Sequence, residues 1–178
     1  GKTFTMQTMA LRMRRKGIQV FIIAPLKGHE FYRAARNVGG EFIQISPASK
    51  NCINIMEIRK VDNSVNELLD GPTLDASALA GKIQRLHIFF SLLIPDMSHE
   101  EKQLLDEALI KTYARKGITH KNESLTDPQH PEQYKKMPIL EDVYNVLLES
   151  EDTKRLAHIL NRLVHGSASS FNQQTNVD

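Results

Sequence analysis

Residues 1–24 decide the expected fold, and they read GKTFTMQTMALRMRRKGIQVFIIA. Apolar residues at helical spacing up to Met13, followed by a basic run that ends at Lys16, predict a helix that Gly17 closes. Residues 18–24 are β-branched and almost continuously apolar, which is typical of a strand buried on both faces of a parallel sheet. The sequence therefore predicts a helix followed directly by a buried strand.

The next residues repeat this order. Residues 30–37 have a helical pattern that Gly39 and Gly40 close, and the alternation of residues 41–45 predicts a second strand. Strands that alternate with helices favour βαβ units around a parallel sheet. The expected fold class is therefore α/β, with residues 1–60 as its core.

The character of the chain changes at about residue 61. Strand patterns disappear, and a capping box at Ser98 to Glu101 predicts the start of one of several helices. Residues 61–165 are expected to form an all-α subdomain inserted into the core. Residues 166–178 are expected to return towards that core.

The composition excludes several classes of protein. Of 178 residues, 40% are hydrophobic and 25% are charged, which is an ordinary globular balance. A net charge of +2 and 6% aromatic residues give little support to DNA as the main ligand, although DNA stays possible. The longest apolar stretch, residues 86–94, is about half the ~20 residues that a membrane span needs. No transmembrane segment or signal peptide is therefore expected.

Gly1, Lys2 and Thr3 match the end of the phosphate-binding pattern G-x-x-x-x-G-K-[ST]. Glycine lets backbone amides approach a phosphate, the lysine ammonium reaches the β- and γ-phosphates, and the threonine hydroxyl ligates Mg²⁺. The expected cofactors of the intact parent protein are therefore ATP and Mg²⁺, bound by Gly1, Lys2 and Thr3, with Thr3 as the metal ligand. The first part of the pattern and a Walker B strand do not occur in these residues, so we expect no ATP hydrolysis by this chain itself.

In three segments the chain resembles the large P-loop ATPases of type IV secretion and conjugative transfer, the VirB/TraC-like family. The segments are GKTFTMQTMALRMRRKG (1–17), VFIIAPLKGHEFYRAARNVGGEFIQISPASKNCINIMEI (20–58) and HGSASSFNQQTNVD (165–178). The resemblance covers nearly the whole chain, and it depends on the order and spacing of these elements. It implies a partial RecA-like parallel sheet of a P-loop NTPase with a helical insertion. This piece would start inside Walker A and end before Walker B.

Two positions depart from the family pattern. Ala24 stands where the family often has Asp before Pro, and Ile55 stands where the family often has Pro after Ile-Asn. The first change removes a carboxylate from the expected end of a strand. Glu30 matches the glutamate of the family's Asp-Pro-x-x-x-Glu-like element, and it is a candidate for orienting water or a neighbouring group. The alternative, that its negative charge stabilises the start of its own helix, is favoured. No other catalytic residue is expected within this chain.

The resemblance also implies the role and the location of the parent protein. The parent would be an oligomeric ATPase, such as a hexamer, that powers conjugative DNA transfer or type IV secretion. It would be cytoplasmic and held at the inner face of the membrane by other secretion or conjugation subunits.

Two alternatives stay open at this point. The chain could be a non-enzymatic helical interaction module, or part of a DNA-translocating pump of the FtsK or coupling-protein kind. The seven histidines show no metal-ligand spacing, and the single cysteine, Cys52, is expected to be a buried apolar residue. The basic run Arg12 to Lys16 is expected to be a solvated helix end.

Overall fold

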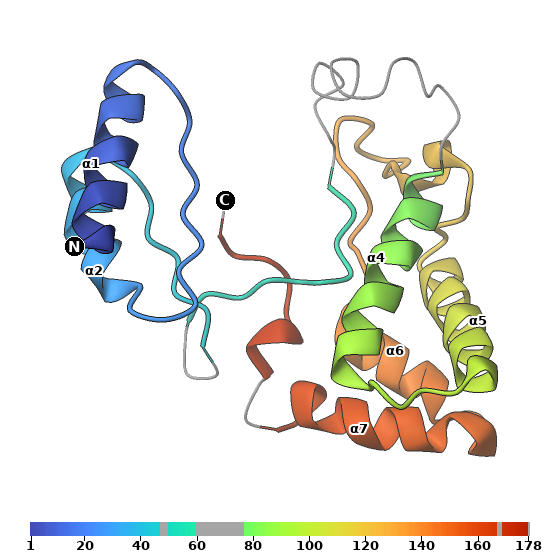
Figure 1. Cartoon of the computed structure of the whole chain (residues 1–178). Coiled ribbons are helices and arrows are strands. Elements are labelled where there is room, and N and C mark those ends of the chain that lie inside the picture. Colours follow the sequence, from blue (N-terminus) through green and yellow to red (C-terminus); the bar gives the residue numbers. More distant parts are fainter. Residues whose placement is uncertain (47–49, 60–76, 167–168, 178) are drawn as a thin grey trace. The chain divides into compact units, whose positions relative to one another are not determined.

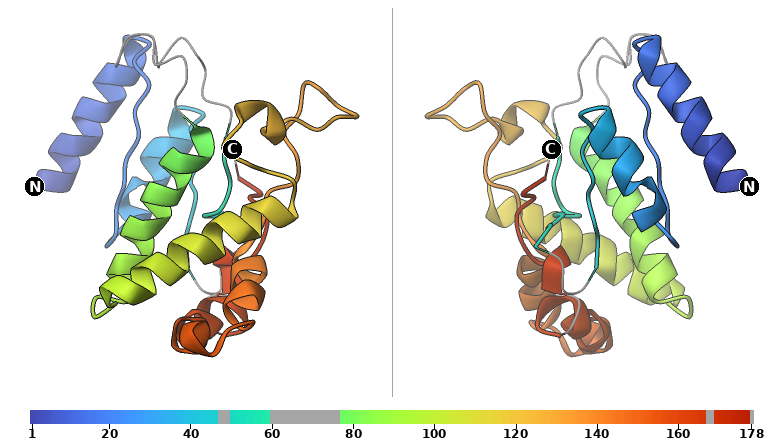
Figure 2. Two further views of the ribbon diagram at one scale, coloured as in Figure 1. Left: turned by 90° about the vertical axis from the view of Figure 1, so that its right-hand side faces the viewer. Right: turned by 90° about the vertical axis from the view of Figure 1, so that its left-hand side faces the viewer.

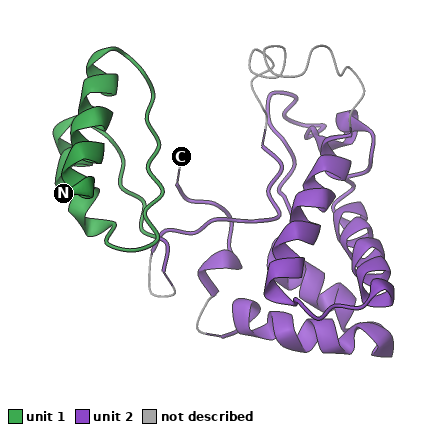
Figure 3. Ribbon diagram, viewed as in Figure 1, with its two compact units in different colours: residues 1–44 green, residues 45–178 purple. Residues whose placement is uncertain are grey.

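The computed structural model describes residues 1–46, 50–59, 77–166 and 169–177 (Figure 1). The chain divides into two compact units, residues 1–44 and residues 45–178 (Figure 3). Unit 1 contains two helices, α1 (Lys2–Arg15) and α2 (His29–Asn37). The helices of unit 2 are α4 (Ala78–Leu93), α5 (His99–Arg115), α6 (Leu140–Leu147) and α7 (Lys154–Val164), with short 3₁₀ turns at Asn122–Leu125, Glu151–Thr153 and Ser169–Phe171. The expected boundary at residues 60 and 61 lies outside the described residues, and the expected division at residues 60 and 165 stays a prediction.

The expected α/β fold with a parallel sheet is wrong: the described part of the chain is helical and contains no strand. The one β pairing among the described residues is an isolated antiparallel bridge between Thr126 and Tyr134. Residues 18–24 and 41–45 lack helical structure as expected, but neither segment forms a ladder. A strand exists only when a neighbour pairs its backbone groups, and apolar composition alone does not supply that neighbour. Accordingly, Phe21 is 82% exposed and Ile23 is 92% exposed.

The segments of unit 1 contact one another through residues at the surface. Gln7 of α1 donates a hydrogen bond from Nε2 to the backbone carbonyl of Glu30 in α2, at 2.7 Å. Tyr32 and Phe42 stack edge to face, with ring centroids 5.2 Å apart. Neither helix of this unit buries a residue. Unit 1 therefore has little of the apolar burial that stabilises a folded domain.

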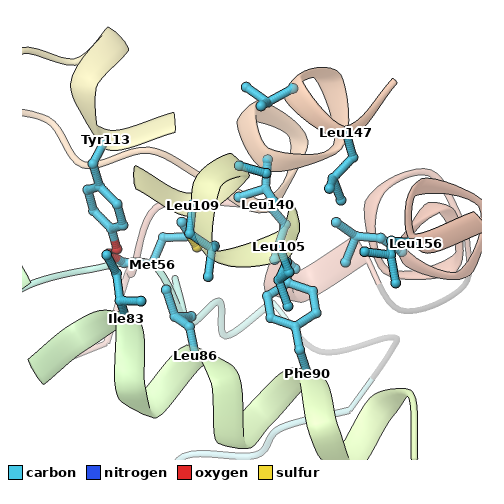
Figure 4. Close-up of a cluster of buried hydrophobic side chains, with 14 of the residues drawn as sticks. Met56, Ile83, Leu86, Phe90, Leu105, Leu109, Tyr113, Leu140, Leu147 and Leu156 are labelled. Atoms are coloured by element: carbon cyan, nitrogen blue, oxygen red, sulfur yellow. The ribbon is translucent and has the colours of Figure 1, made fainter. Parts of the chain in front are cut away.

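Unit 2 has one continuous apolar core. Ile83, Leu86 and Phe90 of α4 point towards Leu105 and Leu109 of α5 (Figure 4). The two helices diverge from a short turn at residues 94–98, as both views of Figure 2 show. Helix α6 packs against α5, and α7 packs against α6. The core forms because each helix has a row of apolar residues on the face that points into the unit.

Short-range sequence features determine where α5 begins and where α1 ends. The predicted capping box is confirmed: the backbone N–H of Ser98 donates to Glu101 Oε2 at 2.9 Å, and the backbone N–H of Glu101 donates to Ser98 Oγ at 3.1 Å. Gly17 follows α1 with a φ of 79°, a backbone conformation that residues other than glycine rarely adopt. Both features depend only on residues close in sequence.

A set of polar contacts joins the two ends of unit 2, and we call residues 50–57 together with residues 172–176 the polar clasp. The side chain of Asn176 accepts a hydrogen bond from the backbone of Cys52 and donates one to the carbonyl of Lys50, both at 2.7 Å. Thr175 Oγ1 accepts from the backbone N–H of Asn54 at 3.0 Å and donates to Glu57 at 2.6 Å. The clasp thus pairs segments more than a hundred residues apart in sequence.

Asn54 is the centre of the clasp. It is 3% exposed, and its side chain donates to the carbonyl of Pro138 at 2.9 Å and accepts from the backbone N–H of Met56 at 3.0 Å. The carbonyl of Met56 accepts a hydrogen bond from the buried hydroxyl of Tyr113 in α5. Burial raises the pKa of the Tyr113 hydroxyl, so it stays a donor at all ordinary pH values. Asn54 and Tyr113 therefore tie the clasp to the helical core.

We expect Asn54→Ala to lower the free energy of unfolding of unit 2 by about 2–3 kcal/mol. The substitution removes the hydrogen-bond partners of the Pro138 carbonyl and the Met56 N–H. Urea denaturation followed by circular dichroism measures this change. Asn145→Ala is the matched control, since Asn145 is exposed on α6 and should change stability by less than about 0.5 kcal/mol. Equal effects of the two substitutions would contradict the central place of Asn54.

We also expect thermolysin to cut first between residues 18 and 26, ~10-fold faster than within α5, α6 or α7, because cleavage needs local opening and neither helix of unit 1 has a buried side chain. Mass spectrometry of the early fragments identifies the site. The double variant Phe21→Ser, Ile23→Ser should slow this cut by removing preferred apolar positions. A first cut inside α5, α6 or α7 would show that unit 2 is the less stable part.

Candidate functional site

The residues of the phosphate-binding pattern lie at the start of α1. Gly1 is the N-cap of this helix, and Lys2 and Thr3 lie in its first turn. Gly1 provides no side-chain cap, and its carbonyl accepts the first helical hydrogen bond from Thr5 at 3.3 Å. The amides ahead of Thr5 therefore lack helical acceptors and point out of the helix end.

The electrostatics of this helix end suit an anion. The first turn contains no acidic residue, and Lys2 is exposed. Within the described ranges, the Lys2 ammonium and the Thr3 hydroxyl have no hydrogen-bond or ion-pair partner. Free amides, the positive end of the helix dipole and an unpaired ammonium together can attract a phosphate group. The chemistry of these donors thus fits the triphosphate and Mg²⁺ that the sequence pattern predicts.

Glu30 lies in the first turn of α2, and unit 1 brings it next to α1. Its backbone carbonyl accepts the hydrogen bond from Gln7, which lies one turn after Thr3. Its half-buried side chain makes no hydrogen bond or ion pair with any residue that the structure describes. The carboxylate also suits the positive N-terminal end of α2. A role for Glu30 in orienting water or a neighbouring group stays a prediction.

Cys52 and His87 have structural partners. The buried Cys52 thiol contacts Gln173 Oε1 at 3.4 Å within the clasp, and His87 pairs with Asp106 at 2.8 Å between α4 and α5. Among the described residues, no group of three histidine, cysteine or acidic side chains could hold a metal ion. The same residues include no helix that is both long and apolar enough to cross a membrane.

One group with an unusual pKa was missed at the sequence level. The pKa of Lys82 on α4 is lowered to about 8. Burial is the main cause, the guanidinium groups of Arg85 and Arg59 act in the same direction, and the carboxylate of Glu57 opposes the change. Lys82 and Arg85 are three residues apart on one helix, which was the available signal. Strongly perturbed groups are enriched at functional sites, which makes Lys82 a candidate functional residue.

We expect NMR of the Lys82 side chain to give a pKa of about 8, returning to 10.5 in the urea-unfolded chain. The charged form is disfavoured only in the folded state, so stability should rise as pH increases from 8 to 10.5. Lys82→Met should therefore increase the free energy of unfolding at pH 7, and this increase should disappear above pH 10.5. Arg85→Gln should raise the pKa of Lys82, whereas a wild-type pKa that equals the unfolded one would contradict this assignment.

Comparison with known proteins places these residues in context. No protein-family model matches the chain, and no curated protein matches it. Among solved structures, the chain is similar to VirB4 of Thermoanaerobacter pseudethanolicus, with 28% sequence identity and a TM-score of 0.77. The match covers 100% of this chain and 44% of the VirB4 chain, so this chain spans less than half of that protein. Structure and sequence together support a relationship of this chain to the type IV secretion ATPases.

Proposed function

We propose that this chain is part of an ATPase that powers type IV secretion or conjugative transfer. The observation that carries the proposal is the match to VirB4 along the whole chain, at 28% identity. The position of Gly1, Lys2 and Thr3 at the start of α1 supports it independently, because this arrangement suits phosphate chemistry.

In this proposal the first turn of α1 contributes to the nucleotide site. Lys2 neutralises charge on the β- and γ-phosphates, and the backbone amides of the turn orient them. The hydroxyl of Thr3 ligates Mg²⁺, which supplies further neutralisation of the phosphate charge. Gln7, one helical turn after Thr3, holds the start of α2 beside α1 through the backbone carbonyl of Glu30.

The chain itself is proposed to bind the nucleotide without hydrolysing it. Hydrolysis needs a group that orients the attacking water. Within the part of the chain that the structure describes, no carboxylate contacts Lys2 or Thr3. Glu30 is the one candidate that the sequence pattern offers, and we propose that in the intact parent it orients water or a neighbouring group.

Unit 2 is proposed to act as a contact surface for other subunits of the secretion or conjugation apparatus. Its core is formed within the unit, so its outer helix faces are available for binding without loss of the fold. We further propose that the parent is an oligomer and that its partners hold it at the inner face of the membrane. DNA is a less suitable ligand for this part, because the net charge is only +2.

The test is an NMR titration of isotope-labelled chain with Mg·ATP. We expect weak, saturable shifts of the amides from Lys2 to Thr5, because three residues and a helix end offer few contacts. Lys2→Ala should abolish these shifts. Lys16→Ala is the matched control, since this exposed lysine lies at the opposite end of the same helix and should leave them unchanged.

Two results would overturn the nucleotide site. Shifts that persist in Lys2→Ala would mean that the triphosphate binds elsewhere. Absence of any shift at saturating Mg·ATP would mean that the first turn of α1 does not bind the nucleotide in this chain.

A further inference from the structure

The first half of helix α4 adjoins residues 57–59. Met56 and Ile83 belong to one core cluster, and both lie at the hydroxyl end of Tyr113 (Figure 4). Residues 57–59 directly follow Met56, and Lys82 directly precedes Ile83. The charged side chains of the two segments therefore come to one part of the surface of unit 2, where they act on one another electrostatically.

Two cations at this place have no anionic partner. Lys82 and Arg85 are three residues apart on α4, so their side chains are neighbours on the helix surface. Neither forms a hydrogen bond or an ion pair with a described residue, and α4 itself contains no acidic residue. The nearby carboxylate of Glu57 already pairs with Arg59 at 3.2 Å and accepts a hydrogen bond from Thr175 at 2.6 Å. Two positive charges thus lack a counter-charge among the described residues.

The missing counter-charge destabilises the ammonium of Lys82. Burial lowers its pKa most, and the guanidinium groups of Arg85 and Arg59 lower it further, to about 8. An anion next to a half-buried cation is attracted more strongly than in bulk water, because less water screens the charges. A dianion would offset both unpaired cations. Phosphate groups have this charge, and a guanidinium can bind two of their oxygens at once.

A hollow adjoins the same cluster. It has a volume of about 340 Å³, and Glu57, Arg59, Tyr134 and Thr175 are among the residues that line it. This volume lies at the lower end of the ~300–1,000 Å³ typical of small-molecule sites. Its carboxylate and hydroxyl groups suit the polar part of an organic molecule. Because Glu57 and Arg59 belong to both the hollow and the charged cluster, one ligand can reach both.

We propose that unit 2 binds a soluble phosphate monoester, with the phosphate on Lys82 and Arg85 and the organic group in the hollow beside Glu57 and Arg59. The ammonium and the exposed guanidinium donate hydrogen bonds to the phosphate oxygens. Arg59, which Glu57 holds in place, adds a third positive charge. A soluble ester is favoured over a lipid headgroup because Lys82 is half-buried, whereas a bilayer presents its phosphates in a plane. The inference concerns unit 2 alone, so failure of nucleotide binding at α1 would leave it unchanged.

An NMR titration of the isotope-labelled full chain with sulfate, against chloride at equal ionic strength, tests the phosphate position. Sulfate is the probe because it keeps two negative charges at all pH values used. We expect saturable shifts of the Lys82 and Arg85 side chains and a rise in the pKa of Lys82 from about 8. The affinity should fall at least ~10-fold between about pH 7 and pH 9.5, since the free chain loses the Lys82 charge over this interval. A pKa of Lys82 that sulfate leaves unchanged would overturn the proposal.

Substitutions separate this site from general charge effects. Arg85→Gln and Lys82→Met should each weaken sulfate binding at least ~10-fold, and Lys82→Met should also remove its dependence on pH. Arg162→Gln is the matched control, since this arginine is exposed in the last turn of α7 and forms no ion pair with a described residue. It removes the same charge as Arg85→Gln and should leave the affinity unchanged. Equal weakening by the two arginine substitutions would overturn the site.

Glucose 6-phosphate tests the hollow. We expect it to shift the amides of Tyr134 and Thr175 in addition to the resonances that sulfate shifts, because its sugar occupies the hollow. Identical shifts with the two ligands would overturn the placement of the organic group.

Vesicles distinguish a soluble ester from a lipid headgroup. Phosphatidylcholine vesicles that contain phosphatidic acid should sediment with no more of the chain than pure phosphatidylcholine vesicles do. Stronger binding to the acidic vesicles that glucose 6-phosphate displaces, and that Arg85→Gln removes, would overturn the assignment to a soluble ligand.

Discussion

The polar clasp is the constraint on which unit 2 depends. Helices α4 to α7 lie between two segments, one near residue 50 and one near residue 176, and the clasp pairs these two segments. Asn54 links that closure to Pro138, and the neighbouring carbonyl of Met56 links it to Tyr113 of α5. A buried polar group without a hydrogen-bond partner destabilises the fold. We therefore expect the clasp and the helical core to form together, because either one alone would leave buried polar groups of the other unpaired.

The two units are stabilised in different ways, and this difference bears on function. Unit 2 has both a buried apolar core and satisfied polar contacts. Neither helix of unit 1 buries a residue, yet this unit carries the residues whose chemistry suits a triphosphate. Groups that bind ligands commonly lie in the less stable parts of a protein, because binding there can supply the missing free energy.

Sequence reasoning succeeded where short-range interactions decide the structure. The capping box at Ser98 and the glycine stop at Gly17 were predicted because both involve residues within one helical turn. The prediction of strands at residues 18–24 and 41–45 was wrong, because a strand needs a second segment to pair with its backbone, and composition cannot reveal that segment. The clasp was missed for the same reason, since Asn176 and Cys52 are 124 residues apart and amide side chains leave no periodic pattern. The family resemblance included Asn54 in its Ile-Asn element, although not as a buried centre of hydrogen bonds.

Native-state hydrogen exchange of the clasp amides tests the central claim most directly. The backbone N–H groups of Cys52, Asn54, Met56 and Asn176 each donate a hydrogen bond within the clasp. If the clasp and the helical core are one cooperative unit, these amides should exchange with the same free energy and denaturant dependence as those of α5. Exchange of the clasp amides through local opening, while α5 stays protected, would contradict the account.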